Sequence, residues 1–526
     1  MNEDDPLNAA QLVVPAIRAE DQAEWAEAEK LAGEGFGGFL LFGGEWPDVR
    51  ARIERVRAAA PGPIVVYSDL ERGAGQQVTG LTRLPHLMAV GAAGDEDLAY
   101  RAGRVTGEEA RAAGVDVVFA PVVDLNTDPA NPIINVRALG DDPERVGRLA
   151  AAWIRGCQEG GAAATAKHYP GHGHTPVDSH LALPTLGAPF ATLTARELAP
   201  FRAAVGAGVR AIMTAHMAVP ALTGDERTPV TLSRRAIGYL RREMGFDGLV
   251  VTDALLMAGI SGAFDEAEAA VLALEAGCDV LLCPADPRRV RDRLEAGLRA
   301  GEIEPGALEA PRARIRQCRP QNTKNQTNAQ APVSRGPDPS LAAGLDLALE
   351  LAARSLVLVD DRGRNLPLRP GGPPPALVIL SGDDVAGPGA ELAAEVLARA
   401  PAARVFPVGP ASPDERLGAA LDLVATAASA GSVAVVAVFS RIAAWKGASG
   451  LPEREARLLA DLVRAGAARA AVVSFASPYL LARARGAGTR VAAWSDEAVS
   501  QRAAARALFG EVPFAGTLPV DENAVR

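Results

Sequence analysis

The sequence predicts an α/β protein in which a (β/α)8 TIM-like barrel is followed by a second α/β domain with a mostly parallel sheet. Three observations predict this architecture. The chain has 526 residues, which is more than one ordinary hydrophobic core accommodates. Short aliphatic runs recur without polar alternation, as in strands buried on both faces of a parallel sheet. Amphipathic segments separate these runs, as the helices of βα units do.

Eight such runs lie within the first 318 residues, which is the number of strands that a βα barrel needs. They are residues 11–15, 38–42, 64–68, 116–120, 162–166, 210–214, 248–252 and 279–283. Segments between them, such as EDQAEWAEAEKLAGEG and DEAEAAVLALEAG, are amphipathic and end at glycine, a frequent helix terminator. We therefore expect a barrel domain over residues 1–318.

A second series of aliphatic runs predicts an open parallel sheet with helices on both faces. These runs are residues 355–359, 376–380, 404–408, 433–439, 470–475 and 490–494. Between the two series lies RPQNTKNQTNAQAPVSRGPDPS, a segment rich in Asn, Gln and Pro with almost no large apolar side chains. Such a composition does not bury enough surface to order itself. We expect a polar linker over residues 319–341 and a C-terminal domain over residues 342–526.

The composition, with 48% hydrophobic and 22% charged residues, is that of a soluble globular protein. The net charge of −10 argues against a nucleic-acid partner, which would require a basic face. No apolar run approaches the ~20 residues of a membrane span, and the N-terminus, MNEDDPLNAAQ, is unlike a signal or transit peptide. The four cysteines form neither a disulfide framework nor a C-x-x-C zinc pair. These features predict a reduced, cytoplasmic protein.

Polar side chains follow several of the predicted barrel strands, at the end where barrel enzymes place their functional groups. They are Asp69 after the third strand, Lys167 and His168 after the fifth, His216 after the sixth and Asp253 after the seventh. The loop after the fourth strand adds Asp124, Asn126, Asp128 and Arg137. One polar loop residue is ordinary, but several that converge on one rim predict a functional site.

Four of the six histidines of the chain lie in KHYPGHGHTPVDSH, residues 167–180, and three interpretations of this cluster are open. The imidazoles can satisfy backbone groups of a structural loop. Alternatively, His172 and His174 can begin a metal site. In the third interpretation a carboxylate orients a histidine for acid–base chemistry, because Asp178 and His180 are two residues apart.

The metal interpretation requires more ligands than the cluster itself provides. Zinc sites use three or four N, S or O donors. His216 and Asp253 can serve in principle, but no second strand has a His-rich motif. The geometric demands of metal sites therefore disfavour this interpretation.

The acid–base interpretation explains more of the segment. Gly171 and Gly173 make the loop pliable, so that it can bring His180 over a bound substrate while Asp178 holds the imidazole in one tautomer. Asp253 ends the buried run in GLVVTDALL and is placed to act as a nucleophile. An alternative of equal weight is that Asp253 caps the helix predicted after it.

Taken together, these segments resemble glycoside hydrolase family 3, specifically its bacterial β-N-acetylglucosaminidase branch. KHYPGHGHTPVDSH is similar, position by position, to the signature loop of that branch, GFDGLVVTDAL to the nucleophile segment of the family and SDLERGAG to its substrate-binding segment. TRLPHLMAVGA, TAHMAVPAL and TPVTLS are also similar. AARSLVLVDDRGRNLPL and LFGEVPFAGTLPV resemble the start and end of the family's second domain, which is an α/β sandwich.

The resemblance implies a role for each candidate residue. Asp253 corresponds to the catalytic nucleophile, His180 to the general acid/base and Asp178 to its partner. The positions that correspond to substrate-binding residues are Asp69, Arg137, Lys167, His168 and His216. The catalytic domain would be the barrel, residues 1–318.

The resemblance also implies an activity, that of a retaining, exo-acting β-N-acetylglucosaminidase (a β-N-acetylhexosaminidase). Its carbohydrate substrates would be GlcNAc-containing glycosides or muropeptides of peptidoglycan turnover. Asp253 would form a covalent glycosyl-enzyme, while His180 protonates the leaving oxygen and then activates water. Histidine suits both steps because its pKa lies near neutral. No metal and no organic cofactor is implied.

Two features depart from the branch, and three other functions stay open. Where the branch has an arginine after the glycines of the substrate-binding segment, residues 73–78 read GAGQQV. The C-terminal domain offers no evident catalytic residue. The chain can be a phosphorylase, because a neutral histidine, unlike a carboxylate, does not repel phosphate. It can also be a metal-dependent barrel hydrolase, or a sugar-binding protein without catalytic activity.

Overall fold

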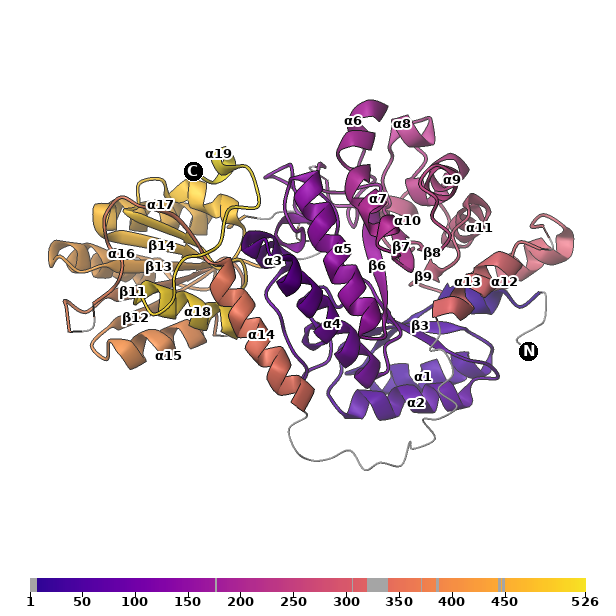
Figure 1. Ribbon diagram of the computed structural model, residues 1–526, viewed down its shortest axis with the longest axis horizontal. Helices are drawn as coiled ribbons and strands as arrows, with labels where there is room; N and C mark the ends of the chain where they lie inside the picture. Colours follow the sequence, from indigo (N-terminus) through magenta and orange to yellow (C-terminus); the bar gives the residue numbers. More distant parts are fainter. Residues whose placement is uncertain are drawn as a thin grey trace. The chain divides into compact units, whose positions relative to one another are not determined.

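The computed structural model divides into two compact units, which Figure 1 shows in the colours of the sequence. The described residues are 7–175, 177–304, 306–318, 339–369, 371–384, 387–442, 446 and 450–526. The first unit comprises Met1–Arg83, Ala99–Leu125 and Pro143–Leu345, and the second comprises Leu84–Leu98, Asn126–Asp142 and Asp346–Arg526. Two short stretches of the N-terminal half thus belong with the C-terminal sequence. The domain boundaries at 318 and 341 stay a prediction, and residues 1–6 and 319–338 of those segments lie outside the described residues.

The first unit contains the predicted barrel, with eight parallel strands in sequence order over its described residues. Pro15, which has no N–H to donate, divides the first of them into β1 and β2. β1 pairs with β9, and a bridge between Val251 and Val280 links β8 to the segment before β9, which closes the ring. Each of the eight predicted runs overlaps one of the strands. These are β1 Val13–Val14, β2 Ala16–Arg18, β3 Gly38–Phe42, β4 Val65–Ser68, β5 Val117–Val118, β6 Ala163–Tyr169, β7 Ala211–Thr214, β8 Leu249–Val251 and β9 Leu281–Leu282.

The helices between the strands begin and end where the sequence provides caps. The Asp21 and Asp265 side chains accept hydrogen bonds from backbone N–H groups in the first turns of α1 and α11. α11 ends at Gly277, whose φ of 108° favours glycine. The helices of this part of the chain are α1 Gln22–Gly33, α2 Asp48–Ala59, α4 Glu96–Ala113, α5 Pro143–Glu159, α6 Phe190–Ala195, α7 Leu198–Gly206, α8 Pro220–Thr223, α9 Arg234–Arg242, α10 Ala258–Ser261, α11 Glu266–Ala276, α12 Pro287–Ala300 and α13 Glu309–Cys318.

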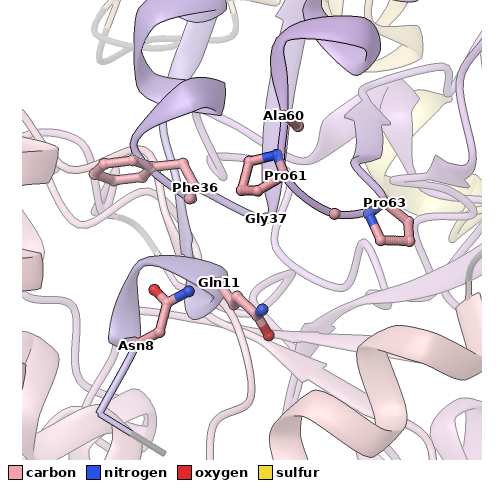
Figure 2. A pocket seen from close by; sticks show the side chains of 9 residues that line it. Asn8, Gln11, Phe36, Gly37, Ala60, Pro61 and Pro63 are labelled. Carbon is pink, nitrogen blue, oxygen red and sulfur yellow. The ribbon is translucent and has the colours of Figure 1, made fainter. Parts of the chain in front are cut away.

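A small cavity lies among the loops at the amino ends of the barrel strands (Figure 2). Asn8, Gln11 and Phe36 line it, together with residues 60–63 before β4. Its volume of about 10 Å³ matches a single water molecule and excludes a sugar. The cavity therefore offers no sugar site, and the candidate residues of the first unit lie at the other end of the strands.

The second unit contains a six-stranded sheet over its described residues, in the order β10-β15-β14-β13-β11-β12. All neighbours pair in parallel except β10, which runs antiparallel to β15. The mostly parallel sheet is confirmed, with one antiparallel edge strand. The strands are β10 Val357–Asp361, β11 Ala376–Ser381, β12 Arg404–Val408, β13 Ala434–Phe439, β14 Ala470–Ser474 and β15 Thr489–Ala492.

α16 Asp414–Ser429 and α17 Glu453–Gly466 pack against strands of this sheet. The other described helices of this unit are α3 Leu87–Ala93, α15 Ala390–Arg399, α18 Ala498–Leu508 and α19 Glu522–Val525. α14 Pro339–Ser355 spans the position at which the first unit ends and the second resumes. α14 begins at residue 339, within the segment predicted as linker. Within the described residues, no helix combines the length and the apolar character that crossing a bilayer requires.

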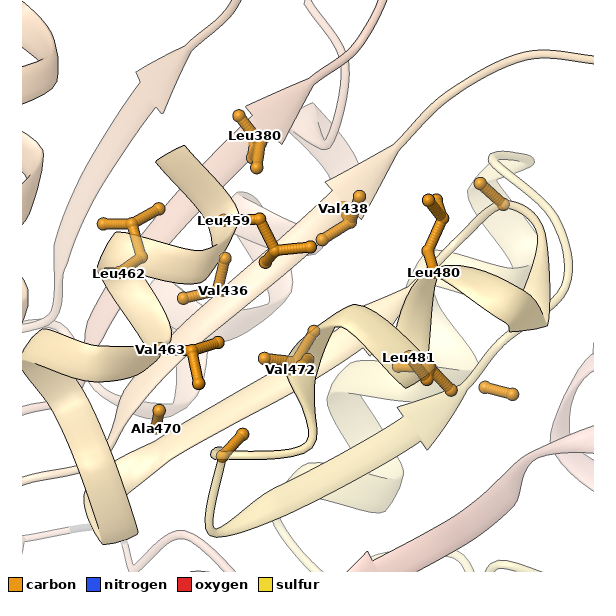
Figure 3. Close-up of a cluster of buried hydrophobic side chains, with 14 of the residues drawn as sticks. Leu380, Val436, Val438, Leu459, Leu462, Val463, Ala470, Val472, Leu480 and Leu481 are labelled. Atoms are coloured by element: carbon orange, nitrogen blue, oxygen red, sulfur yellow. The ribbon is translucent and has the colours of Figure 1, made fainter. Parts of the chain in front are cut away.

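Aliphatic side chains form the core of the second unit (Figure 3). Val436 and Val472 of the sheet pack with Leu459 and Leu462 of α17 in this cluster. Met88 and Val136 belong to the same cluster, which explains why residues 84–98 and 126–142 group with the C-terminal sequence. A chain with only 4% aromatic residues builds its core in this way, from Ala, Val and Leu.

Candidate active site

Seven of the eight candidate residues lie in the first unit, on or beyond the carboxyl ends of the barrel strands. They are Asp69 directly after β4, Lys167 and His168 within β6, Asp178 and His180 in the loop after β6, His216 after β7 and Asp253 after β8. β6 continues to Tyr169, three residues beyond the predicted strand. The pairing of β6 with β7 shifts in register between Ala166 and Tyr169, and such an irregularity re-aims side chains.

Lys167 is a buried cation held by two carboxylates. Its Nζ lies 2.6 Å from Oδ1 of Asp69 and 2.8 Å from Oε1 of Glu71. The Lys167 side chain is only 2% exposed, while that of Asp69 is 28% exposed. Asp69 and Glu71 are two residues apart in an extended segment, so their side chains emerge on the same side. Asp69 is therefore the more accessible of the two carboxylates, since Glu71 is only 8% exposed.

His168 is bonded to a fully buried carboxylate, that of Asp124. Its Nδ1 lies 2.7 Å from Oδ2 of Asp124, whose Oδ1 accepts from the His168 N–H at 3.1 Å and the His172 N–H at 2.8 Å. Burial alone raises the pKa of Asp124, but the charge and hydrogen bond of His168 outweigh it and leave this pKa below its usual 3.8. The ionised carboxylate therefore fixes the orientation of the His168 ring.

Asp178 and His180 form the predicted pair. Oδ1 of Asp178 lies 2.7 Å from Nδ1 of His180 and accepts from the His180 N–H at 2.9 Å. The Asp178 side chain is fully buried, whereas that of His180 is 18% exposed. A buried carboxylate on Nδ1 holds the ring in one orientation and stabilises its positive charge.

Asp253 is half-buried and lies within the electrostatic reach of three imidazoles. Burial by itself raises the pKa of Asp253, but the imidazole charges and one backbone N–H outweigh burial and lower the pKa below its usual 3.8. In decreasing order of effect, the imidazoles are those of His168, His216 and His180. Asp253 is ionised at neutral pH, as a nucleophile must be.

Asp253 does not cap the helix that follows it. α10 begins at Ala258 with Met257 in the N-cap position, four residues further along the chain than the alternative requires. Oδ1 of Asp253 accepts a hydrogen bond from the neighbouring N–H of Ala254 at 2.8 Å. The carboxylate is therefore available for another role.

His216 binds the backbone beside Asp253. Its Nε2 lies 3.0 Å from the carbonyl oxygen of Ala254, and its Nδ1 lies 2.9 Å from Oγ1 of Thr231. Burial lowers the pKa of His216 below its usual 6.5, although the charge of Asp253 opposes this effect. A neutral imidazole that donates from Nε2 to the carbonyl holds the Asp253 loop in place. Contact of His216 with a substrate stays a prediction.

Arg137 belongs to the second compact unit, unlike the other candidates. It lies in the short 3₁₀ helix Asn135–Arg137, and its Nη1 donates to the carbonyl oxygen of Ile133 at 3.0 Å. Its predicted role in binding sugar stays a prediction.

The hydrogen bonds of His172 disfavour the metal interpretation. Nδ1 lies 2.8 Å from Oγ1 of Thr175 and Nε2 lies 2.9 Å from Oγ of Ser179. A ligating histidine must offer the lone pair of one ring nitrogen, and both nitrogens are engaged here. Throughout the described part of the chain, no group of three or more His, Cys, Asp or Glu side chains is arranged to hold a metal ion.

Two carboxylates of this site, Glu71 and Asp124, were not among the predicted site residues. Glu71 has a local signal, because it stands two residues after Asp69 in the same extended segment. Asp124 was noted only as one of several polar residues in its loop. Its partner His168 is 44 residues away, so only the packing of β5 beside β6 reveals the pair.

The glutamines that replace the expected arginine bind backbone. Oε1 of Gln76 accepts from the N–H of Arg72 at 2.9 Å, and Oε1 of Gln77 accepts from the N–H of Gly43 at 3.0 Å. Gln77 thereby joins the loop after β4 to the loop after β3. These side chains shape the rim.

Comparison with known proteins identifies the family. Residues 7–318, more than half of the chain, match the model of the glycosyl hydrolase family 3 N-terminal domain. The β-N-acetylglucosaminidase/β-glucosidase of Cellulomonas fimi is 32% identical over 351 residues, which span 63% of this chain and 60% of that protein. The chain thus aligns with less than two thirds of that relative. The β-hexosaminidase of Neisseria meningitidis serogroup C is 35% identical over 49% of this chain and 73% of its own length.

Solved structures extend the similarity to the whole chain. The glycoside hydrolase family 3 β-N-acetylglucosaminidase of Paenibacillus sp. str. FPU-7 superimposes with a TM-score of 0.84 at 30% identity and covers 98% of both chains. A β-glucoside phosphorylase superimposes with a TM-score of 0.82 at 23% identity, over 100% of this chain and 95% of its own, which shows a shared fold. The predicted fold and the predicted resemblance are both confirmed. The chain belongs to glycoside hydrolase family 3.

Proposed function

We propose that the chain is a retaining, exo-acting β-N-acetylglucosaminidase that works through a covalent glycosyl-enzyme. One observation carries the proposal: the hydrogen-bonded Asp178–His180 pair and Asp253 follow β6 and β8 of one barrel, and a bond of 3.0 Å from the N–H of Gly259 to the carbonyl oxygen of Ser179 joins their two loops. A carboxylate and an oriented imidazole that lie near each other supply the nucleophile and the general acid/base of such a reaction. The names of the family relatives from Cellulomonas, Neisseria and Paenibacillus support GlcNAc as the sugar.

In the first step the Asp253 carboxylate attacks the anomeric carbon, and the bond to the glycosidic oxygen breaks. His180 gives the proton on Nε2 to that oxygen, so that the aglycone leaves as an alcohol. The buried Asp178 stays ionised and stabilises the ring while it carries this proton. The lowered pKa of Asp253 keeps the nucleophile in its reactive form.

In the second step His180, now neutral, takes a proton from water as the water attacks the anomeric carbon and releases Asp253. Two displacements at the same carbon retain its configuration. Asp69, held by Lys167, is suited to accept hydrogen bonds from sugar hydroxyls. Arg137, Lys167, His168 and His216 complete the proposed substrate-binding set.

The test is a panel of p-nitrophenyl glycosides assayed on the wild type, Asp253→Asn and His180→Ala. We expect the GlcNAc glycoside to be cleaved fastest, and Asp253→Asn to lose activity by several orders of magnitude. Asp247→Asn is the matched control, because Asp247 is exposed and lies at the other end of β8.

A mechanism-based fluoro-sugar tests the covalent step. It should label the peptide that contains Asp253 and leave the Asp253→Asn variant unlabelled. Active enzyme that stays unlabelled refutes the glycosyl-enzyme. Catalysis without either residue would refute the whole assignment.

Phosphorolysis is the second candidate, and the imidazole at position 180 favours it. A neutral histidine does not repel an incoming phosphate, whereas a carboxylate would. Rates with and without phosphate distinguish the two reactions, and sugar-1-phosphate among the products identifies a phosphorylase.

The proposed cellular role is peptidoglycan turnover in the cytoplasm. Four free cysteines, all buried, support a reducing compartment. Release of GlcNAc from purified muropeptides, and fractionation of cells that produce the protein, test the role and the location separately.

A further inference from the structure

His172 is a buried histidine for which the proposed mechanism has no use. It lies in the loop that carries Asp178 and His180, and it is 2% exposed. Its Nε2 lies 2.9 Å from Oγ of Ser179, the residue between those two. The side chain of His172 therefore anchors Ser179, which lies between Asp178 and His180 in the sequence.

Ser179 has a second anchor, which leads to the loop of the nucleophile. Its carbonyl oxygen accepts a hydrogen bond from the N–H of Gly259, in α10, at 3.0 Å. A Cβ at Gly259 would lie 3.0 Å from this oxygen and 3.0 Å from Cβ of His216. Glycine therefore permits the close approach of the Ser179 backbone to α10. One residue thus joins the loop after β6 to the loop after β8.

The backbone of His172 is bonded to the part of the site that contains His168, for which we propose a role in sugar binding. Its N–H donates to Oδ1 of Asp124 at 2.8 Å, and Oδ2 of Asp124 binds Nδ1 of His168. A continuous set of buried hydrogen bonds thus runs from His168 through Asp124 and His172 to Ser179. Fully bonded buried networks of this kind fix one geometry.

The protons of this network can be assigned. The Thr175 hydroxyl donates to the carbonyl oxygen of His172 at 3.1 Å, so it accepts from Nδ1–H of the ring. The neutral ring then accepts the Ser179 hydroxyl proton at Nε2. Burial lowers the pKa of His172 below its usual 6.5, although the charge of Asp124 opposes this effect. A neutral ring is consistent with that shift.

We propose that His172 and Ser179 are positioning residues, which hold His180 where it can protonate the leaving oxygen. The inference rests on the proposed function, since it presupposes that His180 is the general acid. It adds that the acid step depends on one hydrogen bond, between Nε2 of His172 and Oγ of Ser179. Loss of this bond should impair proton donation and leave the attack by Asp253 intact.

Leaving groups of different basicity distinguish positioning from a merely structural role. A phenyl glycoside needs proton donation when its bond breaks, whereas a dinitrophenyl glycoside leaves readily as an anion. We expect Ser179→Ala and His172→Asn, whose shorter amide reaches the position of Nδ1 but not that of Nε2, to lose about tenfold in kcat/KM on phenyl β-GlcNAc and less than about twofold on the dinitrophenyl glycoside. The double variant should be no worse than either single variant, because both remove the same bond.

Matched controls come from the same two loops. Ser261→Ala, at the exposed end of α10, and His174→Gln, at an exposed position of the same loop, should behave like the wild type on both substrates. Melting temperatures are measured for every variant. If His172→Asn does not fold, Ser179→Ala, which removes one hydroxyl, carries the test alone.

The reference variant His180→Ala separates this inference from the proposed function. It should show the same leaving-group dependence in a stronger form. If it shows the dependence and Ser179→Ala loses activity equally on both substrates, the positioning role is wrong and the proposed function stands. If His180→Ala shows no leaving-group dependence, the assignment of the acid fails as well.

Discussion

The substitution Asp124→Asn tests whether a buried carboxylate controls the charge of the nucleophile through His168. Asp124 is fully buried and accepts three hydrogen bonds, two from backbone N–H groups and one from Nδ1 of His168. The amide has the same shape, and its oxygen can still serve the two N–H groups. The negative charge disappears, and an NH₂ group faces the ring nitrogen in place of Oδ2.

The structure sets the size of the first expected effect and the direction of the second. The bond to His168 is 2.7 Å long, and a charge-assisted bond contributes about 1.5–3 kcal/mol, so we expect the free energy of unfolding to fall by about 2 kcal/mol. The amide also no longer stabilises a positive charge on His168. After the opposing effect of burial, that charge is the largest influence on the pKa of Asp253. The pKa of Asp253 should therefore rise, and the acid limb of kcat/KM should move to higher pH.

The assay is the pH dependence of kcat/KM for p-nitrophenyl β-GlcNAc between about pH 3 and pH 7, together with urea unfolding. Asp116→Asn is the matched control. Asp116 stands before β5 as Asp124 stands after it, its side chain is also fully buried, and it binds Arg57 at 2.8 Å and the N–H of Val66 at 2.9 Å. The control should lose stability and keep the acid limb of the wild type.

Two results would refute the reasoning. If Asp124→Asn is destabilised and its acid limb coincides with that of the wild type, Asp124 has a structural role alone. If Asp116→Asn moves the acid limb as far as Asp124→Asn does, the shift reports general loosening of the barrel. Neither result depends on the identity of the aglycone.

Three further predictions follow from buried groups. Burial lowers the pKa values of His172 and His216 from 6.5. Below about pH 6.5 the unfolded chain therefore binds protons that the folded chain does not, and the free energy of unfolding should fall as the pH decreases. A free energy of unfolding that stays constant from pH 8 to pH 5 in urea titrations contradicts this prediction. Lys167→Met removes a 2% exposed cation from between two carboxylates and should lower the free energy of unfolding by about 3–5 kcal/mol, measured in the same way. Gly173→Ala would place Cβ 1.8 Å from a backbone carbonyl oxygen and should displace the loop and reduce kcat/KM, whereas Gly187→Ala, with no atom within 4 Å, should match the wild type.

The strands could be predicted because burial on both faces leaves a continuous apolar run. Residues 38–42 and 404–408 form strands with the predicted bounds. The strand predicted over residues 162–166 continues to Tyr169 in the structure. The sequence pattern ends too early because Lys167 and His168 are polar, although both belong to the strand. Pro15 divides a run that the sequence presents as one strand. Strand ends predicted from apolar runs are thus wrong at the site itself, where buried charged side chains take the place of apolar ones.

The sequence predicts the direction of a strand less well than it predicts the presence of the strand. The runs of the second sheet gave no reason to expect that β10 is antiparallel to β15. A parallel and an antiparallel strand in a covered sheet require the same aliphatic residues. β10 does carry Leu358 with 36% exposure and ends in two aspartates, which marks an edge strand without stating its direction.

The site divides in the same way between what is local and what the fold brings together. Asp178 and His180 are two residues apart, so the sequence alone identifies the pair. The bond between Lys167 and Asp69 joins residues 98 positions apart, and barrel topology predicts only that both lie at one rim. Which carboxylate meets which cation at that rim is not visible in any sequence pattern. The three imidazoles that lower the pKa of Asp253 are likewise distant from it in the sequence. The experiments on Asp124 and Ser179 test interactions of this kind, which the fold brings together.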